Sequence, residues 1–245
     1  MGNVKFEHLF TPLQVGPMRV PNRICETTNT INSSMTPGRI DEHFIAHHGA
    51  KARGGTGWIG SETWLLDSPF PPETPDEIGL SMGFASHFGA YQDPAFAEDM
   101  TKFCAEIHDA GSVAIVQLTH LNSVWAPSPV PVLGVQAYTP HVLGEEEIEY
   151  CLNAYANAAE VAKATGADGI EIHCAHETLA YSFLSPVTNR RTDQWGGGPQ
   201  GRVRFVVEAL KRVRERIGDS LALGIRIAGT EFRQGGYQNM ELREM

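Results

Sequence analysis

Five short apolar segments, separated by longer stretches with helical periodicity, constrain the fold of this chain more than any other feature. The candidate strands are residues 23–27, 57–62, 113–118, 169–173 and 222–228. Between them apolar residues recur every three or four positions, as they do along one face of a helix. Because strands that alternate with helices in this way form parallel sheets, the sequence predicts an α/β fold.

Three of the helices have recognisable ends. Asp93 can cap a helix whose first turn holds Pro94, and Gly111 follows its end. A second helix begins with three glutamates at 145–147, which suit the positive end of a helix dipole. A third runs over about 199–217 and stops at Gly218. Each of these helices lies between two of the candidate strands.

The segment 169–173, GIEIH, indicates which side of the sheet carries chemistry. Ile170 and Ile172 alternate with Gly169, Glu171 and His173. Apolar side chains of such a strand meet a covering helix, and the polar ones point inward. His173 ends the strand, at the edge where parallel α/β sheets and barrels keep their functional residues. The sequence therefore predicts a site at the rim of a parallel α/β barrel.

Length and composition exclude some classes of function. A chain with 245 residues, of which 42% are hydrophobic, can bury one large core, and residues 1–245 are expected to form one domain. The net charge of -10 argues against nucleic acid or an anionic membrane as a partner. No stretch approaches the ~20 apolar residues of a membrane span, and residues 1–10 lack an apolar signal core. A soluble cytoplasmic protein is expected.

The cysteines and the basic residues suggest structural roles. Cys25, Cys104, Cys151 and Cys174 lie far apart without C-x-x-C spacing, so neither a zinc site nor an iron–sulfur cluster is indicated. We expect them to be reduced, with Cys104 and Cys151 buried in helices. Basic residues gather at 202–216 on helical spacing, which predicts a solvated helix face.

Segments outside the strands complete the predicted barrel. Residues 15–18, Val-Gly-Pro-Met, form a turn between two short extended pieces, which indicates a hairpin that plugs the barrel floor. Long insertions at 66–75 and 123–143 follow the second and third strands. They are expected to cover the opposite face, above a substrate.

Five motifs identify a family that the chain resembles. They are PNRI at 21–24, ARGGTGWI at 52–59, VQLTH at 116–120, EIHCAH at 171–176 and FLSPVTNRRTDQWGG at 183–197. From Phe10 to Arg233 the chain resembles the old yellow enzyme family of NADH:flavin oxidoreductases. Within it, the chain is most similar to the branch that contains 2,4-dienoyl-CoA reductase and trimethylamine dehydrogenase. The resemblance implies an FMN-binding TIM (β/α)8 barrel, with NAD(P)H as a possible electron donor.

Gln117 and Arg226 suit the flavin-binding role that the resemblance implies for them. Gln117 ends the third strand, and its amide can offer a donor and an acceptor to the pyrimidine edge of the flavin ring. Arg226 lies among small residues on the inward face of the last strand, where a charge needs an anionic or carbonyl partner. The N1 and O2 region of the flavin would be that partner. The alternatives are a polar strand end for Gln117 and an ion pair between Arg226 and Glu171.

His173 and His176 match the pair with which the family holds a substrate oxygen over the flavin. Neutral imidazoles there stabilise the charge that builds up as hydride arrives; the alternative is a packed core histidine. Four further residues match flavin-facing positions of the family: Thr28, Asn29, Thr30 and Thr63. They could equally be ordinary loop residues. Thr30 stands where trimethylamine dehydrogenase-like enzymes carry a cysteine joined to the ring, so covalent attachment is not expected.

The chain differs from the family at the position of the general acid. Thr178 stands where most of the family has a tyrosine that gives a proton to the substrate carbon. A threonine hydroxyl is far too weak an acid for this at neutral pH. Tyr181 is near in sequence but occupies a different position of the motif. Ene reduction of the usual kind would therefore lack its proton donor.

The number of strands is the second departure. The family's barrel has eight strands, and this sequence shows about five, preceded by the hairpin. We therefore expect an incomplete TIM (β/α)8 barrel that lacks the loops after strands seven and eight, which ordinarily bind phosphate. Either the chain is a fragment, or a second polypeptide completes the barrel.

Three functions follow from these observations. The first is reduction of an activated alkene with NAD(P)H, which the family favours by its numbers. The second is an amine dehydrogenase or N-demethylase, for which Trp64, Phe70 and Trp125 could enclose a methylammonium group; the alternative for these aromatics is loop packing. The third is a non-catalytic half-barrel subunit of a split enzyme.

Overall fold

The fold is built on five parallel strands. The computed structural model describes residues 6, 8–29, 39–67, 90–121, 125–131, 139–176 and 178–238. In spatial order the strands are β10 (Ala222–Ile227), β9 (Gly169–Cys174), β6 (Val113–Thr119), β4 (Trp58–Gly60) and β3 (Cys25–Glu26). Neighbours in this order pair in parallel, and each strand overlaps one of the five predicted segments. A short strand β5, Trp64–Leu65, pairs with the end of β6.

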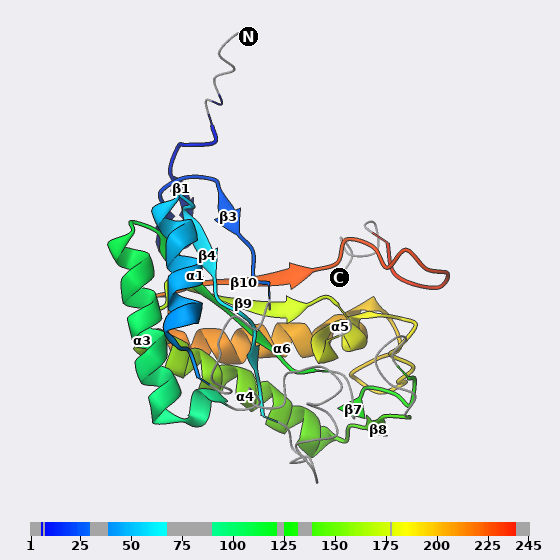
Figure 1. The fold of residues 1–245 in the computed structure, drawn as a ribbon. Coiled ribbons are helices and arrows are strands. Elements are labelled where there is room, and N and C mark those ends of the chain that lie inside the picture. The colour runs from blue at the N-terminus through cyan, green and yellow to red at the C-terminus, as the bar shows by residue number, and fades with distance from the viewer. Residues whose placement is uncertain are drawn as a thin grey trace.

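Helices lie along the outer side of the sheet, with α4 and α6 side by side (Figure 1). They are α1 (Glu42–Arg53), α3 (Pro94–Asp109), α4 (Glu145–Ala164), α5 (Leu179–Leu184) and α6 (Pro199–Ile217), with a 3-10 turn η1 at Ala90–Gln92. The predicted helix ends are confirmed, since Asp93 caps α3 and Gly218, with a φ of 63°, follows α6. Sequence reasoning missed α1, because its buried stripe of Phe44, His48, Gly49 and Ala52 is too weakly apolar to show a clear helical period.

An antiparallel hairpin closes the end of the sheet at which the strands begin. Its strands are β1 (Leu13–Val15) and β2 (Met18–Val20), joined by a turn in which Gly16 has a φ of 55°. Met18 and Val20 pack against Val113 and Ala222, the first residues of β6 and β10, in a small apolar cluster. The predicted plug at the barrel floor is confirmed.

The sheet is half of a barrel with two edges. Among the described residues β3 and β10 each have one neighbouring strand. On β9 the outward residues Ile170 and Ile172 are 2% and 0% exposed, whereas on β10 Ile225 and Ile227 are 39% and 38% exposed. The expected incomplete TIM barrel of five strands with an N-terminal β-hairpin is confirmed.

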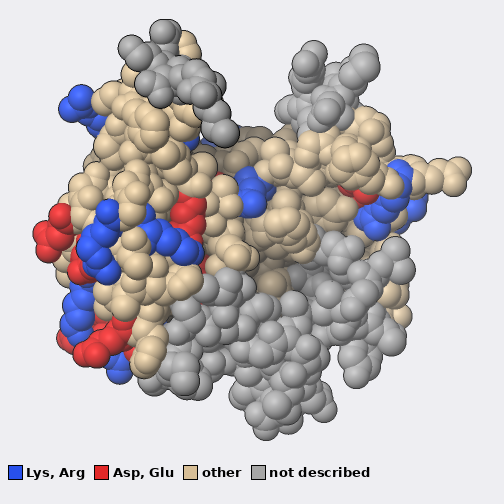
Figure 2. All heavy atoms as spheres, turned by 45° about the horizontal axis from the view of Figure 1, so that its top comes forward, with Lys and Arg blue, Asp and Glu red and all other residues tan. Residues whose placement is uncertain are grey.

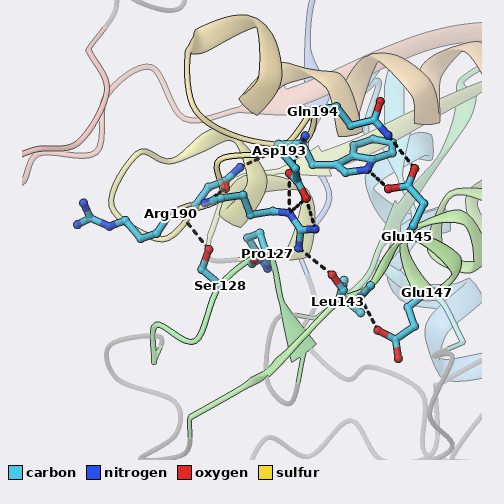
Figure 3. Close-up of polar contacts among 12 residues, drawn as sticks. Pro127, Ser128, Leu143, Glu145, Glu147, Arg190, Asp193 and Gln194 are labelled. Carbon is cyan, nitrogen blue, oxygen red and sulfur yellow. Dashed lines mark hydrogen bonds and ion pairs between the residues drawn. The ribbon is translucent and has the colours of Figure 1, made fainter.

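The arginines of the segment 185–198 serve the fold (Figure 3). The Arg191 guanidinium donates to the carbonyls of Pro127 (3.2 Å) and Leu143 (2.7 Å) and pairs with Asp193. The backbone N–H of Arg190 donates to Ser128 Oγ at 2.8 Å. These contacts hold the two short parallel strands β7 (Trp125–Ala126) and β8 (His141–Val142) against the chain that follows α5.

The expected solvated face on α6 is only partly correct. Arg202 is buried and donates to the carbonyls of Leu184 and Gly197. Two other arginines of α6 pair with α4, Arg212 with Glu149 and Arg216 with Glu160. Helix α4 is acidic on this side, so the basic residues join two helices instead of only facing water.

Cys104 and Cys151 are buried in helices, as expected. All four cysteines are free, with Cys25 exposed and Cys104, Cys151 and Cys174 buried. In the described ranges, no helix is both long enough and apolar enough to cross a bilayer.

Candidate active site

A cavity of about 710 Å³ lies at the carboxyl ends of the parallel strands. Its wall contains these predicted site residues: Thr28, Asn29, Thr63, Gln117, His173, His176 and Arg226. Thr30 lies outside the described residues. In the space-filling view the described surface is hollowed, with a basic group inside the hollow (Figure 2). The fold therefore brings seven of the predicted residues, up to 198 positions apart in the sequence, to one cavity.

Gln117 is held by a chain of hydrogen bonds along the cavity wall. The Thr63 hydroxyl donates to Gln117 Oε1, and Gln117 Nε2 donates to Glu171 Oε1 at 2.6 Å. The side chains come from three neighbouring positions of the sheet, after β4, on β6 and on β9. This fixes which way the amide faces and leaves one N–H and one lone pair of Gln117 for a ligand.

Gly60 brings the chain after β3 close to β4. A Cβ at Gly60 would stand 2.7 Å from both the backbone nitrogen and the hydroxyl of Thr28. Only a residue without a side chain allows this approach. The wall at Thr28 and Asn29 is therefore positioned by backbone packing.

Arg226 carries a charge into the cavity. It lies on β10 directly beside His173 of β9 in the parallel register and is half-buried. Within the described part of the chain no hydrogen bond or ion pair to its guanidinium is found, and Glu171 contacts Gln117 instead. The alternative of an ion pair between Arg226 and Glu171 is not observed. A half-buried guanidinium without a partner suits an anionic or carbonyl ligand.

The two predicted histidines face each other. His173 Nε2 and His176 Nδ1 are 3.2 Å apart, and the ring centroids are 5.0 Å apart. His173 is 7% exposed, and burial, with smaller contributions from the charges of His176 and Arg226, lowers its pKa to about 4. His173 is therefore neutral at pH 7. His176 has a φ of 51°, a left-handed conformation that turns the chain sharply after the strand, and its ring is exposed.

Thr178 stands on the cavity wall at the position where the family has its tyrosine. Thr178 caps α5, where its hydroxyl donates to the His173 carbonyl at 2.8 Å and accepts from the Tyr181 N–H at 3.4 Å. The Tyr181 hydroxyl donates to Glu231, away from the cavity, and burial raises its pKa. Neither side chain offers an acidic proton to a ligand at the histidine pair.

Several cavity residues were missed by sequence reasoning. Tyr91 and Phe96 form an aromatic wall with Trp64, whose ring lies edge-on to Phe96 with centroids 4.9 Å apart. Of the aromatic residues suggested earlier, Trp125 is buried outside the cavity and Phe70 lies outside the described residues. The carboxylates of Glu26 and Glu62 also line the cavity.

No motif marked these positions. Tyr91 precedes the helix that carries Phe96, and only the folded chain brings it beside the strand ends. The Tyr91 hydroxyl donates to Asp67, and burial raises the pKa of this phenol.

Comparisons with known proteins agree with this geometry. The model of the NADH:flavin oxidoreductase / NADH oxidase family matches residues 8–245. The N,N-dimethylglycine/sarcosine dehydrogenase of Chromohalobacter salexigens is 30% identical over 98% of this chain and 35% of its own length. The NADH oxidase of Thermoanaerobacter brockii is 33% identical over 94% of this chain and 35% of its own length. The chain thus spans about a third of these relatives.

Solved structures match as well. A 2-naphthoyl-CoA reductase complex superposes with a TM-score of 0.83 at 26% identity, covering 98% of this chain and 38% of that one. A morphinone reductase gives a TM-score of 0.76 at 26% identity, covering 98% of this chain and 67% of that one. A 6-hydroxypseudooxynicotine amine oxidase from Pseudomonas geniculata N1 gives 0.79 at 26% identity, covering 94% and 34%.

Proposed function

We infer that this chain, which belongs to the NADH:flavin oxidoreductase / NADH oxidase family, holds FMN in its cavity and oxidises an amine bound at the histidine pair. The observation that supports flavin binding is the Arg226 guanidinium, which has no partner among the described residues and lies on the wall that also presents Gln117. The cavity volume of about 710 Å³ falls in the usual range of ligand pockets, ~300–1,000 Å³.

The residues on the wall fit a flavin ring. Gln117, oriented by Thr63 and Glu171, would meet the polar edge of the ring through its free N–H and lone pair. Arg226 would lie at the N1 and O2 region, where negative charge gathers on reduction. Thr28 and Asn29 would border the reactive edge. When bound, FMN supplies a two-electron acceptor for the hydride that leaves the C–H bond beside the substrate nitrogen.

His173 and His176 prepare the amine. An alkylammonium ion has no lone pair to support hydride loss, so it must first lose a proton. We assign the shared hydrogen to His176 Nδ1, which donates to Nε2 of neutral His173 across 3.2 Å, so the lone pair of His176 Nε2 is free to take that proton. Trp64, Tyr91 and Phe96 would surround the apolar part of the substrate. Water then adds to the iminium and releases the demethylated amine and an aldehyde.

Thr178 favours amine oxidation over ene reduction. Ene reduction needs an acid beside the substrate carbon, and the Thr178 hydroxyl is committed to capping α5 while Tyr181 faces Glu231. Amine oxidation needs a base, which the histidine pair offers. The two relatives that oxidise amines by name support the same choice. Reduction of an activated alkene with NAD(P)H, which the resemblance favoured first, becomes the second candidate, supported by the 2-naphthoyl-CoA reductase and morphinone reductase matches.

The remaining barrel strands would complete the site. The chain spans about a third of its relatives, and the outward face of β10 is exposed at Ile225 and Ile227. We propose that further strands, from the rest of a longer chain or from a second polypeptide, pack there and bind the FMN phosphate. Flavin retention by the 245-residue chain, measured by absorbance against the completed protein, tests this. Tight stoichiometric FMN on the 245 residues alone would refute it.

The substrate class is tested by stopped-flow spectroscopy on the completed protein. Flavin reduction by a panel of N-methylated amines is compared with reoxidation of reduced flavin by cyclohexenone. We expect fast reduction by at least one amine and slow enone turnover, which Thr178→Tyr accelerates, since general acid catalysis contributes about 100- to 10,000-fold. Thr178→Ser, which keeps the capping hydroxyl, is the control. Rapid enone turnover that is unchanged by Thr178→Tyr would overturn the choice, and no turnover of either class would favour the non-catalytic half-barrel.

A further inference from the structure

A second group of polar side chains lies between β3 and α1, partly behind the cavity wall. It consists of Glu26 of β3 and the adjacent His47 and His48 of α1, whose candidate ligand atoms all lie within 4.8 Å of one another. Neither the flavin nor the amine requires these two histidines. Glu26 also lines the cavity, but the proposed redox reaction assigns it no role, so the arrangement does not depend on that proposal.

The Glu26 carboxylate is divided between two partners. Lys51, one turn after His47 on α1, donates to Glu26 Oε1. The other oxygen, Oε2, faces His48 Nδ1 at 3.4 Å, which is long for a hydrogen bond. Lysine thus fixes the orientation of the carboxylate and leaves one oxygen turned toward the imidazole.

The histidines carry polar atoms without partners. His48 has a side chain that is 1% exposed, and its Nε2 has no hydrogen-bond partner among the described residues. The Nε2 of His47 is likewise buried and without a partner there. Buried nitrogen atoms are normally hydrogen-bonded, so two such imidazoles on adjacent residues need an explanation.

We propose that Glu26, His47 and His48 bind a divalent transition-metal ion, with Zn²⁺ as the best match. Two imidazoles and one carboxylate are a ligand set that zinc uses, and a set of three leaves a fourth position for water. Zinc lies about 2.0–2.1 Å from such ligand atoms, so the three side chains close in from their present separation when the ion binds. Lys51 keeps the carboxylate monodentate by holding its second oxygen.

An ion at this place would join a helix to a strand that leads into the cavity. Glu26 is the last residue of β3, and Thr27, Thr28 and Asn29 follow it along the cavity wall. The metal would brace α1 against β3 and hold this stretch in position. It would act as a structural ion beside the redox site.

The experiment uses Co²⁺ as a spectroscopic probe on the tag-free full chain. Tetrahedral Co²⁺ absorbs in the visible range, and Zn²⁺ should displace it. We expect saturable one-to-one binding that Glu26→Gln, His47→Gln or His48→Gln each weakens by at least about tenfold. His43→Gln, on an exposed residue of the same helix, is the matched control and should bind as the wild type does. Zn²⁺ should also raise the Tm of the wild type and of His43→Gln but not of the three ligand variants.

Two results would overturn the proposal. One is the absence of saturable Co²⁺ binding by the wild type. The other is wild-type affinity in both Glu26→Gln and His47→Gln. These two residues are only partly buried, so their variants decide the matter even where His48→Gln, at a buried position, fails to fold.

Discussion

Strands β9 and β10 are neighbours with the same alternating pattern, and they differ in what covers them. On β9 the outward Ile170 and Ile172 belong to the same buried cluster as Val206 and Ala209 of α6. On β10 the outward Ile225 and Ile227 remain more than a third exposed. The comparison shows that alternation decides which face a residue takes, while burial depends on whether a covering layer is present.

The inward faces of β9 and β10 also differ in whether their polar side chains have partners. His173 and Arg226 are paired in the register, yet His173 is buried against His176 whereas Arg226 has no partner among the described residues. His173 thus has a side-chain neighbour within the described residues, although its buried Nδ1 has no hydrogen-bond partner there. Strand β10 presents a charge and an apolar face that further atoms would have to meet.

The largest difference is expected when the outward isoleucines are shortened. Ile172→Ala leaves a cavity in the core and should lower the free energy of unfolding by about 2–5 kcal/mol. Ile227→Ala, on the exposed face of β10, should lower it by less than about 1 kcal/mol. Urea denaturation of the two variants measures both values. Equal losses would contradict the comparison.

The pH dependence of stability should report the burial of His173. Its pKa is about 4 in the fold and about 6.5 in an unfolded chain, so the unfolded state binds more protons between these values. The contribution of neutral His173, roughly 3 kcal/mol, is complete above pH 6.5 and is lost as the pH falls toward 4. His173→Gln should flatten this part of the profile. An unchanged slope in His173→Gln would show that the site is not desolvated.

Arg226 should matter for flavin and little for folding. In the completed protein, loss of a charged hydrogen bond of about 1.5–3 kcal/mol corresponds to roughly 10- to 150-fold weaker FMN binding by Arg226→Ala. Arg226→Lys should retain part of the affinity. His173→Gln serves as the contrast, because it should weaken ligand-induced changes in the flavin spectrum and leave flavin content near normal. Fluorescence titration with FMN measures the affinity of each variant. Wild-type affinity for FMN in Arg226→Ala would show that Arg226 does not contact the flavin.

The smallest effect is expected at Ile225. Ile225→Thr keeps the β-branched shape and should change the stability of the 245-residue chain by no more than about 0.5 kcal/mol. In the completed protein, where further strands would cover this face, the same change should cost measurably more. Thermal unfolding of both forms compares them. The same small effect in both would mean that nothing packs on β10.

Local signals sufficed for most elements of the fold. The five strands, the hairpin and helices α3, α4 and α6 follow from alternation, helical period and capping residues such as Asp93 and Gly218. Helix α1 was missed because histidine and glycine occupy part of its buried stripe. For the site, strand-end positions and family motifs predicted seven of the residues that line the cavity. Tyr91 and Phe96 escaped because they enter the cavity from outside the strands.

The sequence by itself determined the face and the order of each element, because the side-chain period and the end signals act over a few residues. Only the tertiary structure decided which polar groups meet. Gln117 donates a hydrogen bond to Glu171, 54 positions away, so Glu171 does not pair with Arg226. Thr178 caps α5, and the Tyr181 hydroxyl donates to Glu231. The physical reason is that a hydrogen bond needs atoms within about 3 Å, and neighbouring strands bring together residues that no local pattern relates.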